Sequence, residues 1–143
     1  MPLPFGNVFF VNVQTYLFFD GCCQQAIALY TQVMQAELLH VTHFSEAPTA
    51  LKAPGPDHMV FHSTLKIGDT LLNLCDDPTM ERGTFGGFVL LAHLDSGDAV
   101  DTAAKLLAID GRLDLPSQQV PWANRYAIAT DRFGVTWKLQ FSE

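Results

Sequence analysis

Two of the five histidines, His58 and His62, have a spacing that could place a reactive pair on one strand. Residues four positions apart on a strand point to the same face, so the two imidazoles could meet in a cleft. There they would act as a proton-transfer pair or as metal ligands. Two ordinary strand histidines are the alternative, and we favour it. His40 and His43 lie three positions apart, so they fall on opposite faces of a strand.

Cys22 and Cys23 are a second candidate, because they fall in the first turn of an expected helix. The helix dipole can lower the pKa of a thiol there and make it a nucleophile. Free cysteine usually packs as a small apolar side chain, and we favour that interpretation. With Cys75, the three cysteines form no CxxC pair and no even disulfide framework. Because the N-terminus also lacks the pattern of a signal peptide, we expect a cytoplasmic protein with reduced thiols.

The stretch PWANRYAIATDRFGVTWKLQF, residues 121–141, concentrates aromatic and basic side chains. Trp122, Arg125 and Tyr126 could form the floor of a site for an anionic or flat ligand. Core packing of an aromatic-rich hairpin would use the same residue types, so both interpretations stay open. The turn at Gly134 decides which side chains share a face. A bulge after a type I turn places the even-numbered residues of both strands together, whereas a two-residue turn does not.

Composition limits the classes of partner. The chain has 143 residues, of which 48% are hydrophobic and 16% charged, and this is typical of one globular domain with a real core. Its formal net charge of −7 disfavours nucleic acid and anionic membrane surfaces, since both need clustered lysine and arginine. No apolar run approaches the roughly 18 residues of a membrane span.

A pattern of one strand, one helix and three strands occurs twice along the chain. In the first half, the helix that follows Asp20-Gly21 has Ala26, Ile27 and Tyr30 on one face. Strands are expected there over 11–19, 36–44, 58–67 and 70–75. The second half has a helix over 98–109 and strands over 87–94, 111–115, 123–130 and 135–141. We therefore predict an α+β fold of paired βαβββ modules in a single domain, residues 1–143, with module one at about 11–77 and module two at about 86–143.

Three stretches carry a resemblance to a known family: YLFFDGCCQQAIALY, FHSTLKIGDTLLNLCDD and PWANRYAIATDRFGVTW. They resemble the PhnB-like branch of the vicinal oxygen chelate superfamily, which includes glyoxalase I, bleomycin-resistance proteins and extradiol dioxygenases. The resemblance implies curved sheets that each enclose a cleft, a homodimer and, in many members, a divalent metal. It implies no particular reaction, because one fold hosts many chemistries.

The resemblance also places the metal ligands of the superfamily on this sequence. The corresponding positions are Gln14 or Thr15, Leu72 or Asn73, Val89, and Lys138. Glutamate is usual at the last of these positions, whereas the ammonium of Lys138 has no lone pair and repels a cation. Leucine and valine cannot ligate either. We therefore expect neither this metal site nor another cofactor.

These considerations predict a small-molecule-binding protein of the glyoxalase/bleomycin resistance type that works without the superfamily metal. The expected lining of its mostly apolar cleft is Tyr16, Phe18, His62, Trp122, Arg125, Tyr126 and Lys138. One alternative is a metal-dependent lyase or dioxygenase with a rearranged site built from His58, His62 or His93. A second alternative is a non-catalytic dimerisation module. The expected partners are a small-molecule ligand and a second copy of the chain, with no nucleic acid and no membrane; whether a reaction is catalysed stays open.

Overall fold

The computed structural model describes residues 10–51, 54–80 and 85–143. The first half contains β1 (Thr15–Phe19), α1 (Cys23–Met34), β2 (Glu37–His43), β3 (Val60–Ile67) and β4 (Thr70–Asp76). Two short 3₁₀ turns, η1 (Phe44–Glu46) and η2 (Thr49–Leu51), follow β2. The second half contains β5 (Leu90–His93), α2 (Gly97–Ala108), β6 (Arg112–Val120), β7 (Ala123–Thr130) and β8 (Thr136–Phe141). None of the helices in these residues is long and apolar enough to cross a membrane.

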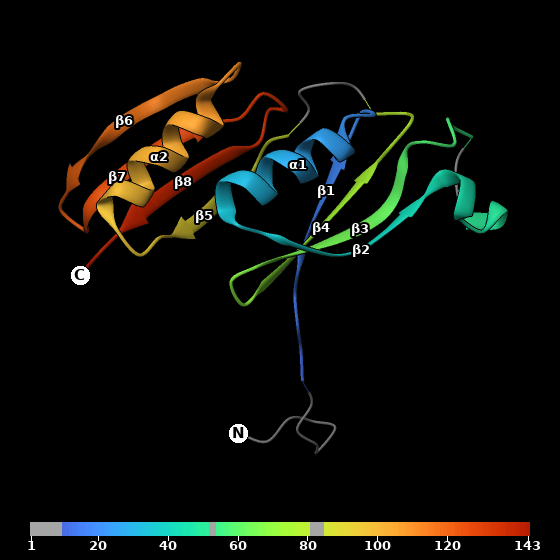
Figure 1. Ribbon diagram of the computed structural model, residues 1–143, viewed down its shortest axis with the longest axis horizontal. Coiled ribbons are helices and arrows are strands. Elements are labelled where there is room, and N and C mark those ends of the chain that lie inside the picture. The colour runs from blue at the N-terminus through green and yellow to red at the C-terminus, as the bar shows by residue number, and fades with distance from the viewer. Residues whose placement is uncertain (1–9, 52–53, 81–84) are drawn as a thin grey trace.

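Each half folds into a four-stranded sheet with one helix, and the two halves have the same topology (Figure 1). The strand order is β1-β4-β3-β2 in the first sheet and β5-β8-β7-β6 in the second. In both sheets the first strand runs parallel to the last strand of its half, and the other pairs are antiparallel. This arrangement confirms the predicted α+β fold of paired βαβββ units.

Local sequence features explain where the two helices form. In α1 the buried residues Ala26, Ile27 and Tyr30 recur at helical spacing and form one apolar face. The helix ends at Gln35, which has the left-handed φ of 53° that terminates many helices. In α2 the hydroxyl of Ser96 accepts a hydrogen bond from the Ala99 N–H at 3.0 Å, so it satisfies one of the free donors of the first turn.

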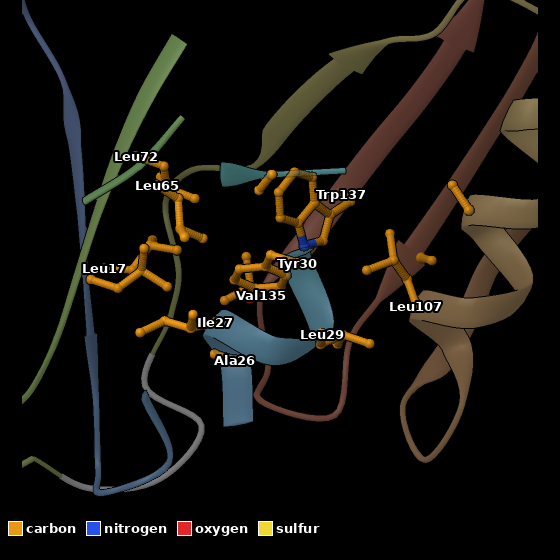
Figure 2. Packing of buried hydrophobic residues seen from close by; sticks show 14 of the residues in the cluster. Leu17, Ala26, Ile27, Leu29, Tyr30, Leu65, Leu72, Leu107, Val135 and Trp137 are labelled. Carbon is orange, nitrogen blue, oxygen red and sulfur yellow. The ribbon is translucent and has the colours of Figure 1, made fainter. Parts of the chain in front are cut away.

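Helix α1 joins the two halves into one core (Figure 2). One side of the helix packs on the first sheet, and Tyr30 reaches Trp137 of β8 with 5.2 Å between ring centroids. The Tyr30 hydroxyl donates to Asp131 Oδ2 at 2.7 Å. Asp131 is buried, and it also accepts from Trp137 Nε1 at 3.1 Å and from the N–H groups of Phe133 at 3.0 Å and Val135 at 3.1 Å. Four donors thus hold one carboxylate at the junction of the halves.

A second buried carboxylate organises the first half. Asp76, at the end of β4, accepts through Oδ1 from the N–H groups of Gly21 at 2.9 Å and Cys23 at 3.0 Å. Through Oδ2 it accepts from the Val60 N–H at 2.9 Å. Asp76 therefore ties the start of α1 to the start of β3, and its partners are main-chain donors of its own half.

Each sheet has one face covered by helices and one face without a helix, which we call the open face. In β1 the side chains of Leu17 and Phe19 are buried in the core, whereas Tyr16 and Phe18 are 43% and 46% exposed on the open face. In the second sheet, Ile128 pairs with Lys138 and Tyr126 pairs with Gln140. Even-numbered residues of β7 and β8 therefore share the open face. This is the outcome expected of a bulged turn at Gly134, whose φ is 94°.

Candidate functional site

The open face of the first sheet brings together side chains from all four of its strands. Tyr16 comes from β1, His40 from β2, His62 from β3 and Cys75 from β4. The hydroxyl of Tyr16 lies 2.5 Å from His62 Nδ1, which is a short hydrogen bond. Together with Phe18, we call these five residues the Tyr16–His62 cluster.

Aromatic contacts hold the rings of the Tyr16–His62 cluster against one another. Tyr16 meets Phe18 edge to face with 5.3 Å between ring centroids, and its centroid lies 5.5 Å from that of His62. His40 meets His62 edge to face at 4.7 Å. Such contacts restrict the rotamers of the rings, so the cluster presents a fixed arrangement of flat surfaces and nitrogen atoms.

The electrostatics of the cluster favour the neutral forms of Tyr16 and His62. Partial burial and the neighbouring His40 lower the pKa of His62 below its usual value. Burial, followed by the nearby Cys75 thiol, raises the pKa of Tyr16. We therefore assign the Tyr16 hydroxyl as the donor and His62 Nδ1 as the acceptor. In this tautomer the proton of His62 is on Nε2, so the ring offers one N–H donor to a ligand.

A shallow cavity of about 510 Å³ lies beside Tyr16 and Phe18. Its walls come from β1, from the segment after β4 and from the segment before β5. The residues that line it are Tyr16, Phe18, Asp77, Thr79, Met80, Phe85, Gly86 and Phe88. Four of these side chains are aromatic, so the cavity is suited to a flat, mainly apolar molecule.

The other predicted lining residues lie on the second sheet. Trp122 packs edge to face on Tyr126 with ring centroids 5.3 Å apart, and Lys138 lies on the same open face, in register with Ile128 and Leu91. The cavity beside Tyr16 and Phe18 is lined by none of these residues. The structure therefore divides the predicted lining into a first-sheet group and a second-sheet group.

Arg125 belongs to neither group, and its grouping with Trp122 and Tyr126 needs correction. Its guanidinium lies 2.5 Å from Asp101 Oδ2 of α2, on the helix-covered face of the second sheet. Adjacent residues of a strand point to opposite faces, so Arg125 points away from the face of Tyr126. An ion pair with the helix explains this basic residue without a ligand.

The positions that correspond to the superfamily metal ligands do not form a set of donors. Asn73 Nδ2 donates to Gln14 Oε1 at 2.8 Å, so two amides meet at the first-sheet position. On the second sheet the register places Leu91 of β5 beside Lys138, while Val89 precedes that strand. A leucine and an ammonium supply no lone pair to a cation. The residues present therefore do not fit the divalent metal that the superfamily implies.

The histidines proposed for a rearranged metal site are also apart. His58 lies in the turn before β3, His62 lies within that strand, and His93 lies on β5 of the second sheet. In residues 10–51, 54–80 and 85–143, no three His, Cys, Asp or Glu side chains gather closely enough to hold a metal ion.

The thiols show no sign of activation. Burial and the nearby Asp20 carboxylate raise the pKa of Cys22 to about 11, and burial raises that of Cys75 to about 11. Burial also raises the pKa of Cys23. A thiol with a raised pKa is protonated at neutral pH, so none of the three is poised as a nucleophile.

The neighbour of His62 that sequence reasoning missed is His40. The antiparallel register pairs Thr42 with His62 and His40 with Thr64, so His40 is a diagonal neighbour of His62 on the open face. Spacing within β2 cannot reveal this contact, because it depends on how β2 pairs with β3. This partner could have been found by testing which registers of β2 against β3 bring two histidines together.

Comparison with known proteins gives the same assignment from sequence and from structure. Residues 12–139 match the Glyoxalase/Bleomycin resistance protein/Dioxygenase superfamily. YjdN of Escherichia coli (strain K12) is 29% identical over 133 residues, which cover 87% of this chain and 90% of YjdN. PA1353 of Pseudomonas aeruginosa has a TM-score of 0.82 at 25% identity, over 92% of this chain and 98% of that protein. A PhnB protein of Bacillus cereus has a TM-score of 0.80 at 24% identity, over 92% and 100%.

These similarities confirm the predicted relation to PhnB-like proteins and the fold that goes with it. They agree with the duplicated sheet topology and with the three stretches from which the relation was first inferred. The chain belongs to the glyoxalase/bleomycin resistance protein/dioxygenase superfamily.

Proposed function

We propose that this protein binds a small, flat and mostly apolar molecule at the Tyr16–His62 cluster, without the superfamily metal. The observation that carries the proposal is the hydrogen-bonded Tyr16–His62 pair beside a cavity with four aromatic walls. The rings supply apolar contact area, and His62 supplies a directed N–H donor. Partial exposure of Tyr16 and Phe18 leaves both side chains accessible to a ligand.

The proposal of metal independence rests on donor chemistry. The resemblance places the second-sheet metal ligands at Val89 and Lys138, and the strand neighbour of Lys138 is Leu91. A divalent ion held by only two neutral amides, Gln14 and Asn73, would have a weak and incomplete coordination shell. Metal analysis of protein purified without a chelator tests this point. Stoichiometric metal with residues 14 and 138 in its shell would contradict it.

The second-sheet group is a separate candidate surface. Trp122 is exposed and covers Tyr126, and Lys138 places an ammonium on the same open face. These residues could complete the lining if the two open faces contribute to one cleft. We assign them the smaller part in binding, because no described cavity wall connects them to Tyr16 and Phe18.

We also propose that the protein forms a homodimer. Residues 10–14 extend from β1 away from both sheets (Figure 1), and Phe10 and Val13 are 97% and 90% exposed. Strands β1 and β5 are both sheet edges, and edge strands with exposed apolar residues invite pairing with another chain. Light scattering coupled to size exclusion should give twice the chain mass, and the Phe10→Ser/Val13→Ser double variant should weaken the dimer. A monomeric wild type at micromolar concentration would exclude the proposal.

A binding measurement with a neutral probe tests the proposed site. The probe is 2-naphthamide, a flat aromatic amide, titrated calorimetrically into protein that has been dialysed against a chelator. Phe18→Ala should weaken binding about tenfold, because it removes one aromatic wall. Ile109→Ala, which truncates a side chain of similar exposure just after α2, is the matched control. Equal affinity of both variants would place the probe elsewhere.

A further inference from the structure

The Tyr16–His62 cluster contains no carboxylate, although the chain has 15 acidic and 8 basic residues. The titratable groups that contact the His62 ring are Tyr16 of β1 and His40 of β2. From β4, Cys75 adjoins Tyr16. Further along the same face of β3, Lys66 pairs with Glu37 across the strands. Within the described part of the chain, an anion at His62 would therefore lie closer to hydrogen-bond donors than to another negative group.

The nearest acidic group on the cavity wall is already engaged. Asp77 accepts hydrogen bonds from the N–H of Thr79 at 2.9 Å and from its hydroxyl at 2.7 Å. These two donors hold the carboxylate in the turn after β4 and lower its pKa. Asp77 is therefore a fixed charge at the end of the cavity formed by that turn, and it leaves the imidazoles without an internal counter-ion.

The number and type of donors fit one particular anion. Two imidazoles, with ring centroids 4.7 Å apart, can each offer one N–H to the two oxygens of a carboxylate. Neither arginine nor lysine contacts them within the described residues, so a doubly charged phosphate would be poorly compensated. The adjacent aromatic side chains of Tyr16 and Phe18 would cover a ring attached to that carboxylate.

We infer that the Tyr16–His62 cluster binds an aromatic carboxylate and takes up a proton on a histidine as it does so. This inference rests on the proposed function and names its ligand class. In the free protein, partial burial and the neighbouring His40 lower the pKa of His62. A bound carboxylate supplies the missing counter-charge, so it favours the imidazolium form of His62. Binding must then strengthen as the pH falls, with a limit of about tenfold per pH unit for one proton.

The experiment compares 2-naphthoate with its neutral analogue 2-naphthamide by calorimetry at pH 6 and pH 8. We expect 2-naphthoate to bind about tenfold more tightly at pH 6, whereas the affinity for 2-naphthamide stays constant. Titrations of the anion in two buffers with different ionisation enthalpies should show proton uptake. His62→Gln keeps a neutral donor but cannot titrate, and it should remove most of this pH dependence. His58→Gln, in the turn before the same strand, should behave as the wild type.

Each outcome decides between the two proposals. If 2-naphthamide binds but the affinity for 2-naphthoate does not change with pH, the carboxylate inference is wrong and the proposed function stands. If the pH dependence survives in His62→Gln, His62 does not take up the proton and the inference is again wrong. If neither probe binds, the proposed function fails and takes the inference with it. Circular dichroism of each variant confirms that it is folded.

Discussion

The two halves of this protein have the same strand order and helices of 12 residues each, yet their open faces differ. The first sheet carries a hydrogen-bonded tyrosine and histidine with further rings beside them. The second sheet carries Lys138 and a Trp122–Tyr126 pair. Their helix-covered faces are alike, because both bury leucine, valine and alanine against a helix. One face of each sheet therefore specifies the fold, and the other is free to differ in chemistry.

The two buried carboxylates show a similar difference. Asp76 binds three main-chain N–H groups of its own half. Asp131 binds two main-chain N–H groups and two side chains, Tyr30 and Trp137, and Tyr30 belongs to the other half. Asp76 thus stabilises a module from within, whereas Asp131 also stabilises the contact between modules.

The largest predicted effect is the loss of stability on substitution of Asp131. Asp131→Asn should lower the free energy of unfolding by about 3 kcal/mol, because the amide group must face a buried N–H or O–H donor. Asp76→Asn should cost about 2 kcal/mol for the same reason, with the loss confined to its own half. Urea denaturation measures both values, and the exposed Asp57→Asn variant is the control. A larger loss for Asp76→Asn would reverse the proposed roles.

The pH dependence of the stability of Asp131→Asn gives a further test of the role of this carboxylate. Burial raises the pKa of Asp131 in the folded protein. A raised pKa means that the carboxyl contributes most to stability below its unfolded pKa of about 3.9, and that this contribution falls as the pH rises through the folded pKa. The stability difference between wild type and Asp131→Asn should therefore narrow from pH 4 towards pH 7. A difference that widens over this range would contradict the raised pKa.

An effect of intermediate size, on the affinity for 2-naphthamide, distinguishes the two open faces. Phe18→Ala should weaken 2-naphthamide binding about tenfold, whereas Trp122→Ala should change it less than about twofold. The reason is that Phe18 lines the aromatic cavity and Trp122 does not. Calorimetric titration of the two variants side by side gives the ratio. Equal losses would show that both sheets contribute to one cleft.

The smallest predicted effect concerns Arg125. Arg125→Gln should cost about 0.5 kcal/mol of stability, because its ion pair with Asp101 is partly exposed to solvent. Binding of 2-naphthamide should not change. A loss of affinity without a loss of stability would return Arg125 to the binding site.

The sequence predicted the fold well, because α1, α2, β1 and β8 each have a clear apolar face. The sequence left open whether the even-numbered residues of the last two strands share a face, because this depends on the type of turn at Gly134. The register of β7 and β8 shows that they do. Tyr16, Phe18 and His62 were proposed from the sequence as lining residues, and their role in binding stays a prediction. His40 was not among them, because its contact with His62 depends on how β2 pairs with β3. Arg125 was grouped with its neighbours because the Asp101 partner is distant in sequence and lies on a helix.

The most direct test of the central claim is to map the neutral probe on the chelator-treated protein by nuclear magnetic resonance. We predict that 2-naphthamide shifts the ring resonances of Tyr16, Phe18 and His62, and leaves those of Trp122 unchanged. These shifts should be the same with and without added divalent metal. Shifts centred on Trp122, or shifts that appear only after metal is added, would contradict the proposed metal-independent site on the first sheet.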